Sequence, residues 1–187
     1  GFYDHIANLC KEHKVVLIAD EIQCGYGRSG KFFAFQHYNI KPDIITVAKG
    51  MGNGFPMAGV LIHESIKASY GMLGTTFGGN HLACAAGLAV LEVIEKEGLI
   101  ENSARLFEYF KTKAASIPQI KKIKGMGLML GLEFDFEVSE LRKKLIYDQH
   151  IFTGGANNKQ LLRILPALNI TKENVDHFFD ALKKELK

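Results

Sequence analysis

The stretch "PDIITVAKGMGNGFPMAG" at residues 42–59 joins an uninterrupted apolar run to a lysine and a glycine-rich segment. The apolar residues 44–48 end at Lys49, and glycines follow at positions 50, 52 and 54. Short continuous apolar runs are typical of strands that are buried on both faces of a parallel sheet. The pattern therefore predicts a strand that ends on an amine and leads into flexible chain.

Two further apolar runs share this design. "VVLIAD" at 15–20 ends in Asp20, and "AGVLIH" covers 58–63. Strands that alternate with glycine-rich connections and helices predict an α/β layer structure. Ligands of open α/β sheets bind at the carboxyl ends of the strands, so neighbouring strands would bring Asp20 and Lys49 to one crevice. Taken singly, each residue also suits a structural ion pair or a solvated strand end.

The remaining elements are predicted from periodicity and from residues that favour helix ends. Apolar spacing predicts a helix over 2–13, and small residues followed by Gly98 predict one over 80–97. We place a domain boundary near Gly98. The predicted elements beyond it are a helix from Leu99 to Pro118, a strand over 127–134, a helix over 139–149, a strand over 161–168 and a helix over 171–186.

Composition excludes several classes of protein. A net charge of +3, with acidic and basic residues mixed, argues against a nucleic-acid surface. No apolar run reaches the roughly 18 residues of a membrane span. The three cysteines, Cys10, Cys24 and Cys84, are scattered, which predicts reduced thiols and a cytoplasmic protein. Cys10 and His13 have a ligand-like spacing, but no second pair follows, so we expect no metal site.

Three segments in a fixed order carry a resemblance to a known family. "ADEIQCGYGRSG" (19–30), "TVAKGMGNGFPMAG" (46–59) and "GTTFGGN" (74–80) resemble the class III aminotransferases, which are fold-type-I pyridoxal-phosphate enzymes. "KGMGLMLGLEF" (124–134) and "RILPAL" (163–168) extend the likeness, which is near to acetylornithine and ornithine aminotransferases. The resemblance implies the C-terminal part of a cofactor-binding large domain over 1–97, mainly a parallel sheet covered by helices. A small C-terminal α+β domain would follow over 98–187.

The resemblance also implies roles around a bound pyridoxal phosphate. Lys49 would form the Schiff base and then move the proton between the substrate Cα and the cofactor. Asp20 would pair with the pyridine nitrogen and keep it protonated. Ile22 would pack on the ring face, and Gln23 would hydrogen-bond the 3-oxygen of the ring. From the residues alone, Gln23 could equally well cap the turn that follows the strand.

Two more residues gain roles from the resemblance. Thr76 would reach across a homodimer interface to the cofactor phosphate of the other subunit, so that the active sites are shared. Arg163 would bind the α-carboxylate of the substrate, because a guanidinium can grip a carboxylate with two hydrogen bonds. Without the resemblance, Thr76 would belong to an ordinary Gly/Thr turn, and Arg163 would be a surface arginine. Arg28 is expected to order its loop rather than to act in the chemistry.

Departures from the family pattern are few. His81 stands where many relatives carry proline, and Thr75 stands where serine is common. The phosphate loop of the family and the aromatic residue that stacks on the cofactor are expected upstream of Gly1, so the chain is expected to be a C-terminal portion.

The activity implied is transfer of the δ-amino group of N-acetylornithine, or N-succinylornithine, to 2-oxoglutarate in arginine biosynthesis. Ornithine or 4-aminobutyrate aminotransferase are alternatives, as is a non-catalytic folded module formed by these residues alone. The glycines of 50–59 match neither pattern of a nucleotide phosphate loop, so a nucleotide-binding domain is disfavoured.

Overall fold

The computed structural model describes residues 1–186, and the chain divides into two compact units. The first unit comprises Gly1–Gly27 and Lys31–Gly98, and the second comprises Arg28–Gly30 and Leu99–Lys187. The chain therefore passes between units after Gly27, after Gly30 and after Gly98. Each of these glycines has a positive φ, of 87°, 85° and 59° respectively.

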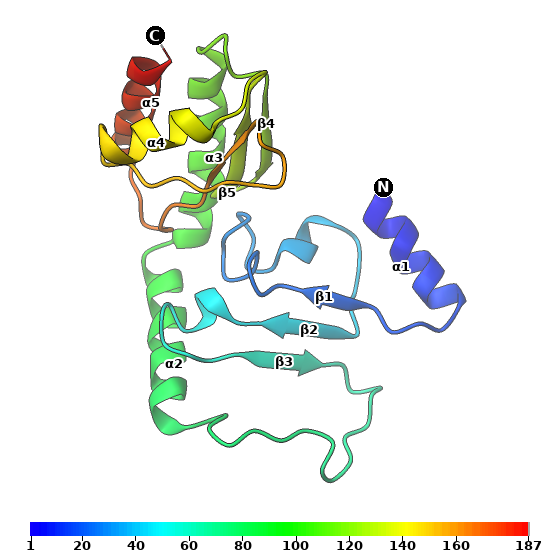
Figure 1. Cartoon of the computed structure of the whole chain (residues 1–187). Helices are drawn as coiled ribbons and strands as arrows, with labels where there is room; N and C mark the ends of the chain where they lie inside the picture. The colour runs from blue at the N-terminus through cyan, green and yellow to red at the C-terminus, as the bar shows by residue number, and fades with distance from the viewer. Residues whose placement is uncertain (187) are drawn as a thin grey trace. The chain divides into compact units, whose positions relative to one another are not determined.

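The first unit contains a three-stranded sheet with helices before and after it (Figure 1). Its elements are α1 (Phe2–Glu12), β1 (Ile18–Asp20), η1 (Ala34–His37), β2 (Ile44–Val47), η2 (Lys49–Met51), β3 (Gly59–Ile62) and α2 (His81–Lys96). The strand order is β1-β2-β3. β1 pairs parallel with β2, and Asp20 lies opposite Thr46. The carboxyl ends of β1 and β2 therefore lie at the same edge of the sheet.

The strands differ from the prediction in direction, length and burial. β3 pairs antiparallel with β2, so only one of the two pairings is parallel. The strand predicted over 15–20 begins only at Ile18. The exposed fraction of Ile18 is 56%, whereas that of Val47 on β2 is 2%. The expectation of burial on both faces is wrong for β1 within the described residues. An apolar run indicates that a strand prefers cover, but it does not specify which segment supplies that cover.

Helix α2 begins and ends at the predicted positions for local reasons. The Asn80 side chain caps its first turn by accepting a hydrogen bond of 3.0 Å from the Ala83 amide. Gly98 follows its end in the left-handed conformation that glycine favours. A Cβ at Gly87 would lie 2.9 Å from Met57 Cε, so the small residue lets the helix pack closely on the loop after β2.

The second unit is built on an antiparallel sheet with the order β4-β5-β6. Its elements are α3 (Leu99–Ala115), β4 (Lys122–Met126), β5 (Met129–Glu133), α4 (Ser139–Tyr147), β6 (Leu161–Ile164) and α5 (Lys172–Glu185). An isolated bridge between Gly154 and Arg163 adds a pairing on the free side of β6. Strand β4 was not predicted, because the sequence "KIKGM" has lysines at alternate positions and only a single β-branched residue.

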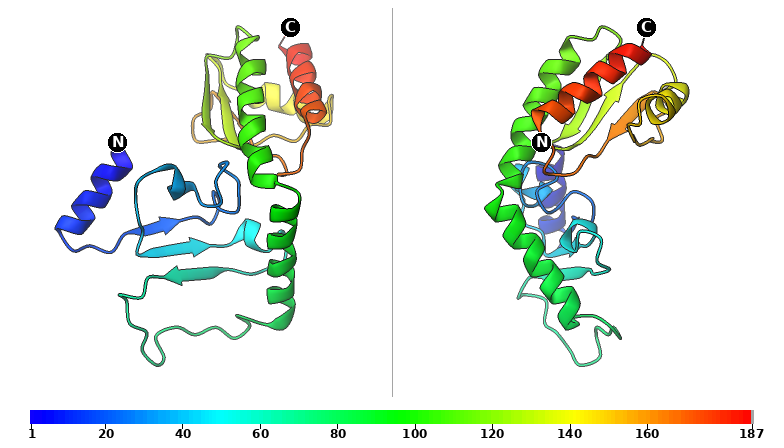
Figure 2. Two further views of the ribbon diagram at one scale, coloured as in Figure 1. Left: turned by 180° about the vertical axis from the view of Figure 1, so that it is seen from behind. Right: turned by 90° about the vertical axis from the view of Figure 1, so that its left-hand side faces the viewer.

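The core of the second unit lies between this sheet and its helices. Figure 2 shows α3 and α5 running beside each other against the sheet. The Phe110 ring of α3 lies 5.6 Å, centroid to centroid, from the Phe179 ring of α5. Residues with at most 1% exposure include Leu106, Leu128, Leu132, Phe134, Leu145, Leu162, Val175, Phe179 and Leu182. Every element of the unit except β4 supplies a residue to this buried cluster, whose apolar burial is its main source of stability.

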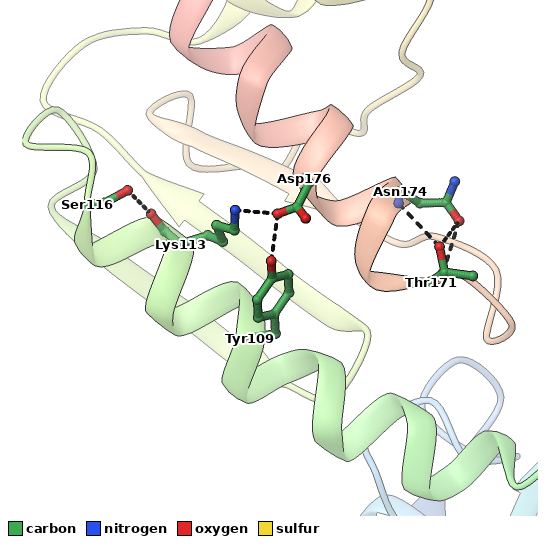
Figure 3. Close-up of polar contacts among 6 residues, drawn as sticks. All are labelled: Tyr109, Lys113, Ser116, Thr171, Asn174 and Asp176. Atoms are coloured by element: carbon green, nitrogen blue, oxygen red, sulfur yellow. Dashed lines mark hydrogen bonds and ion pairs between the residues drawn. The ribbon is translucent and has the colours of Figure 1, made fainter.

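Polar contacts at the surface join α3 to α5 (Figure 3). The Asp176 carboxylate on α5 accepts a hydrogen bond of 2.7 Å from the Tyr109 hydroxyl and pairs with the Lys113 amine. Thr171 caps α5 by accepting a hydrogen bond of 3.4 Å from the Asn174 amide, and the Asn174 side chain accepts one of 2.9 Å from the Thr171 amide. These reciprocal bonds fix where α5 begins.

Candidate active site

Asp20 is the last residue of β1, and its carboxylate is held through one oxygen. Oδ1 accepts a hydrogen bond of 3.0 Å from the Ile22 amide and one of 3.4 Å from the Thr46 hydroxyl. Within the fully described first unit, Oδ2 accepts no hydrogen bond, and the residue is exposed. The structure thus orients the Asp20 carboxylate at the end of the strand and leaves one oxygen open.

Lys49 follows β2 by two residues and starts η2. Its φ of 39° lies in the left-handed region, which residues other than glycine seldom adopt. Such strain is often found at functional positions, where the surrounding structure maintains it. The side chain is exposed, and within its unit the amine makes no hydrogen bond or ion pair. Lys49 therefore presents an unengaged amine one strand away from Asp20.

The turn that begins at Lys49 packs against the loop that follows β1. A Cβ on Gly50 would lie 3.3 Å from Cβ of Tyr26, which is 8% exposed. That approach is tighter than an ordinary van der Waals contact, so the glycine allows the two loops to lie close together. Gly50 thus serves the packing of these two loops.

Glu21 is a structural determinant of the site that the sequence analysis missed. The side chain is 2% exposed, and its carboxylate accepts hydrogen bonds of 2.9 Å from the Ala34 amide and 2.8 Å from the Phe35 amide. It also accepts one of 3.1 Å from the Cys24 thiol. The clue was available, because successive residues of a strand point to opposite faces. Of two consecutive carboxylates, only one can face the crevice, and the other needs partners inside.

Ile22 and Gln23 lie in the turn directly after Asp20, where Ile22 is half-buried and Gln23 is exposed. Their contacts with a cofactor ring stay predictions. Thr76 is exposed in the segment 63–80, which passes β3 on the side away from β1 (Figure 1). The structure brings Asp20, Ile22, Gln23 and Lys49 to one edge of the sheet. Within the first unit, Thr76 forms no hydrogen bond with these residues.

Arg163 belongs to the second unit and lies on β6 with its side chain exposed. Its amide donates a hydrogen bond of 3.0 Å to the Gly154 carbonyl, and its carbonyl accepts one of 2.8 Å from the Gly154 amide. On the other side of β6, Gly131 is its partner in β5. The backbone of Arg163 is therefore fixed from both sides while its guanidinium stays accessible.

Arg28 anchors a short segment in the second unit. Its guanidinium donates to the Pro166 carbonyl, and burial lowers the pKa of the guanidinium. Its own carbonyl accepts hydrogen bonds of 3.2 Å from the Ser103 hydroxyl and 3.0 Å from the Leu128 amide. A Cβ on Gly127 would lie 2.6 Å from the same carbonyl oxygen. These contacts give Arg28 a structural role within its unit.

Comparison with known proteins identifies the family. The sequence profile of "Aminotransferase class-III" matches residues 1–186, so the chain belongs to the class III aminotransferases. Members of this class depend on pyridoxal phosphate. The chain is 42% identical to the acetylornithine aminotransferase of Methanocaldococcus jannaschii, covering 95% of this chain and 46% of that protein. It is 41% identical to the acetylornithine aminotransferase of Aquifex aeolicus, covering 99% of this chain and 48% of the relative.

Solved structures agree with the family assignment. The ornithine aminotransferase of Plasmodium yoelii matches with a TM-score of 0.87 and 31% identity, over 99% of this chain and 51% of that one. The ornithine δ-aminotransferase of Plasmodium falciparum matches with a TM-score of 0.85 and 30% identity, over 98% of this chain and 49% of that one. The family and the α/β class expected from the sequence are confirmed. The chain spans about half the length of the curated relatives it matches.

Among the residues that the structure describes, no helix is both long enough and apolar enough to cross a membrane.

Proposed function

We propose that the protein containing this chain is a pyridoxal-phosphate-dependent aminotransferase that moves the δ-amino group of N-acetylornithine, or N-succinylornithine, to 2-oxoglutarate. One observation carries the proposal. Lys49, after β2, has a free amine, and Asp20, at the end of the neighbouring strand β1, has one carboxylate oxygen without a hydrogen bond in its unit. Curated acetylornithine aminotransferases share 41% and 42% identity with the chain, which supports the acylated substrate. Free ornithine is the second candidate, because solved ornithine aminotransferases share its fold.

The residues present suit the cofactor of the family. A pyridine nitrogen needs an acceptor that keeps it protonated, and Asp20 Oδ2 has no hydrogen bond within its unit. An aldehyde needs an amine that is not already paired, and Lys49 supplies one. Ile22, half-buried beside Asp20, offers an apolar side chain for a ring face. The acceptor, the amine and the apolar surface thus come from one edge of one sheet.

Pyridoxal phosphate, when bound, supplies a carbonyl that condenses with amines and a ring that accepts electrons. The chain supplies the groups that control it. Lys49 would hold the cofactor covalently, and its released amine would carry a proton to or from the substrate Cα atom. Asp20, oriented by Ile22 and Thr46, would hold the proton on the ring nitrogen. Gln23 would donate to the ring 3-oxygen.

Arg163 would bind a substrate carboxylate, since its guanidinium is exposed while its backbone is fixed on both sides. We further assign the first unit to the cofactor-binding large domain (1–97) and most of the second to the small domain (98–187). Thr76 would contact the cofactor phosphate of the other subunit in a homodimer. Exposed apolar side chains in and beside its segment support a covered surface there; they are Tyr70, Met72, Leu73, Phe77 and Leu82. A cytoplasmic location suits the three unpaired cysteines.

The test uses the full-length enzyme and the variant Lys49→Ala, with Lys67→Ala as an exposed lysine control in the same unit. We expect wild type and the control to bind pyridoxal phosphate with an absorbance band that borohydride fixes onto the peptide containing Lys49. Lys49→Ala should lose both the fixed label and turnover while its thermal unfolding is unchanged. Retained turnover in Lys49→Ala would refute the proposal.

Two comparisons then refine the assignment. Asp20→Asn should slow removal of the Cα proton more than it weakens cofactor binding, because the weaker acceptor leaves the ring nitrogen less protonated. The ratio of kcat/KM for N-acetylornithine over ornithine decides between the two candidate substrates. If residues 1–187 alone fold but bind no cofactor, these residues alone form a non-catalytic module.

A further inference from the structure

Arg163 is flanked by glycine on both sides of its strand. Gly131 lies opposite it on β5, and Gly154 lies opposite it across the isolated bridge. Side chains directly opposite each other on one face of a sheet have Cβ atoms about 4.5–5.5 Å apart and normally contact each other. At this position both neighbours lack a side chain. The Arg163 side chain therefore has no lateral neighbour from either flanking residue.

The two glycines do not face the same atoms. A Cβ on Gly131 would meet the Leu161 side chain, at 2.9 Å from Cγ. A Cβ on Gly154 would lie 2.7 Å from Nε and 3.2 Å from Nη2 of Arg163. The guanidinium thus lies over the Cα atom of Gly154, in the space that a methyl group would fill. Gly154 has no left-handed φ, so the backbone conformation does not explain why glycine is present there.

The loop that carries Gly154 is itself held by a second arginine. Arg142 on α4 donates a hydrogen bond of 3.2 Å to the Thr153 carbonyl. A Cβ on Gly155 would lie 3.1 Å from Arg142 Nη1, so Gly155 faces Arg142 as Gly154 faces Arg163. Arg142 Nε and the Thr153 hydroxyl are buried without a hydrogen-bond partner among the described residues. The Nη2 bond to the Thr153 carbonyl thus links Arg142 to this loop.

We propose that Gly154 is a positioning residue for carboxylate binding: the lack of a side chain at Gly154 sets where the Arg163 guanidinium lies. The inference rests on the proposed role of Arg163. The nearest atoms to a methyl group at position 154 all belong to the Arg163 side chain, so the methyl group displaces the far end of a flexible arginine at little cost in stability. A methyl group at position 154 therefore tests the effect of moving the guanidinium while the stability of the fold stays the same.

The experiment uses the full-length enzyme with the variants Gly154→Ala, Gly155→Ala and Arg163→Ala. The probe is glutarate, which has the two carboxylates of 2-oxoglutarate without the reacting carbonyl, and its binding is measured by calorimetry. Arg163→Ala should weaken glutarate binding about 10- to 100-fold, as expected for lost hydrogen bonds to a charged group. Gly154→Ala should weaken it at least about fivefold, because misplacing a binding group by an ångström is costly.

The matched control is Gly155→Ala, which adds the same methyl group to the same loop against the other arginine. It should leave glutarate binding within about twofold of wild type. Gly154→Ala should leave the thermal unfolding temperature unchanged and raise KM for 2-oxoglutarate more than it lowers kcat. Combining Gly154→Ala with Arg163→Ala should weaken glutarate binding no further than Arg163→Ala alone, since interacting sites are not additive.

The outcomes separate the inference from the function on which it rests. If Arg163→Ala weakens glutarate binding and Gly154→Ala does not, only the inference is overturned. Equal losses in Gly154→Ala and Gly155→Ala, or a further loss when Gly154→Ala is added to Arg163→Ala, also overturn it. If Arg163→Ala leaves glutarate binding unchanged, the proposed role of Arg163 fails and the inference fails with it.

Discussion

The Glu21 carboxylate accepts a hydrogen bond of 2.8 Å from the Phe35 amide, across a separation of 14 residues. Together with the hydrogen bond from the Ala34 amide, this bond joins the start of the loop that follows Asp20 to residues much further along the chain. Asp20 is the residue immediately before Glu21. The orientation of the proposed cofactor contact therefore depends on a carboxylate that faces the other way and takes no direct part in the chemistry.

Replacing Glu21 should loosen this loop. Glu21→Ala leaves two amides without their acceptor, and we expect a loss of about 2–4 kcal/mol in the free energy of unfolding. Hydrogen exchange at the Ala34 and Phe35 amides should accelerate. The control is Glu64→Ala, an exposed carboxylate in the same unit, which should change stability by less than about 0.5 kcal/mol. Unchanged exchange at both amides in Glu21→Ala would contradict this account of the loop.

Cys24 should be an unreactive thiol and a source of alkaline sensitivity. Burial, then the hydrogen bond to Glu21 and its charge, raises the pKa of Cys24 from 9.0 to about 12. Between these values the unfolded chain has lost the proton while the folded chain keeps it. Stability should therefore fall as pH rises from 9.0 to about 12, and less steeply in Cys24→Ala.

Alkylation gives an independent measurement on the same thiol. At pH 8 iodoacetamide should label the exposed Cys84 well before Cys24, because the thiolate is the reacting form. Mass spectrometry of partially labelled protein gives both rates in one sample. Labelling of Cys24 as fast as Cys84 would show that the thiol is not held as the structure places it.

Ser103 should stabilise the second unit through the segment Arg28–Gly30. Its side chain has no exposed surface, donates to the Arg28 carbonyl and accepts a hydrogen bond of 3.1 Å from the Leu128 amide. Ser103→Ala should cost about 1–3 kcal/mol in denaturant unfolding. Thr112→Ala is the control and should cost much less, because it removes an exposed hydroxyl on the same helix that donates to the Glu108 carbonyl. A similar cost for both variants would argue that the Arg28 contact is unimportant.

Asp176 should contribute stability that is lost in acid. The hydrogen bond from Lys113, followed by that from Tyr109, holds the pKa of this carboxyl below its ordinary value of 3.8. Because the folded form binds the proton less readily than the unfolded form, the contribution is present above pH 3.8 and declines as pH falls below it. Asp176→Asn should flatten the acid limb of a stability–pH curve. A limb that matches wild type would remove Asp176 as its cause.

The sequence predicted the strand ends of the site because apolar runs that end in Asp20 and Lys49 follow local rules. The same rules found α2 through Asn80 and Gly98, whose caps depend on neighbouring residues alone. The alternation of side chains indicates that Glu21 points away from Asp20, but the partners of Glu21 and Ser103 lie 14 and 75 residues away, and nothing local identifies such pairs. Burial of β1 was overestimated, since an apolar run does not identify the segment that covers it.

The boundary between the two units has a consequence for any attempt to divide the protein. Since Arg28–Gly30 belongs to the second unit, that unit is discontinuous in sequence, and no single cut separates it from the first. A polypeptide that starts at Leu99 would lack the carbonyl that Ser103 and Leu128 share. Its Gly127 would then face a vacant space where the missing tripeptide belongs, so the tripeptide would have to be supplied as a separate peptide or reattached by a new connection.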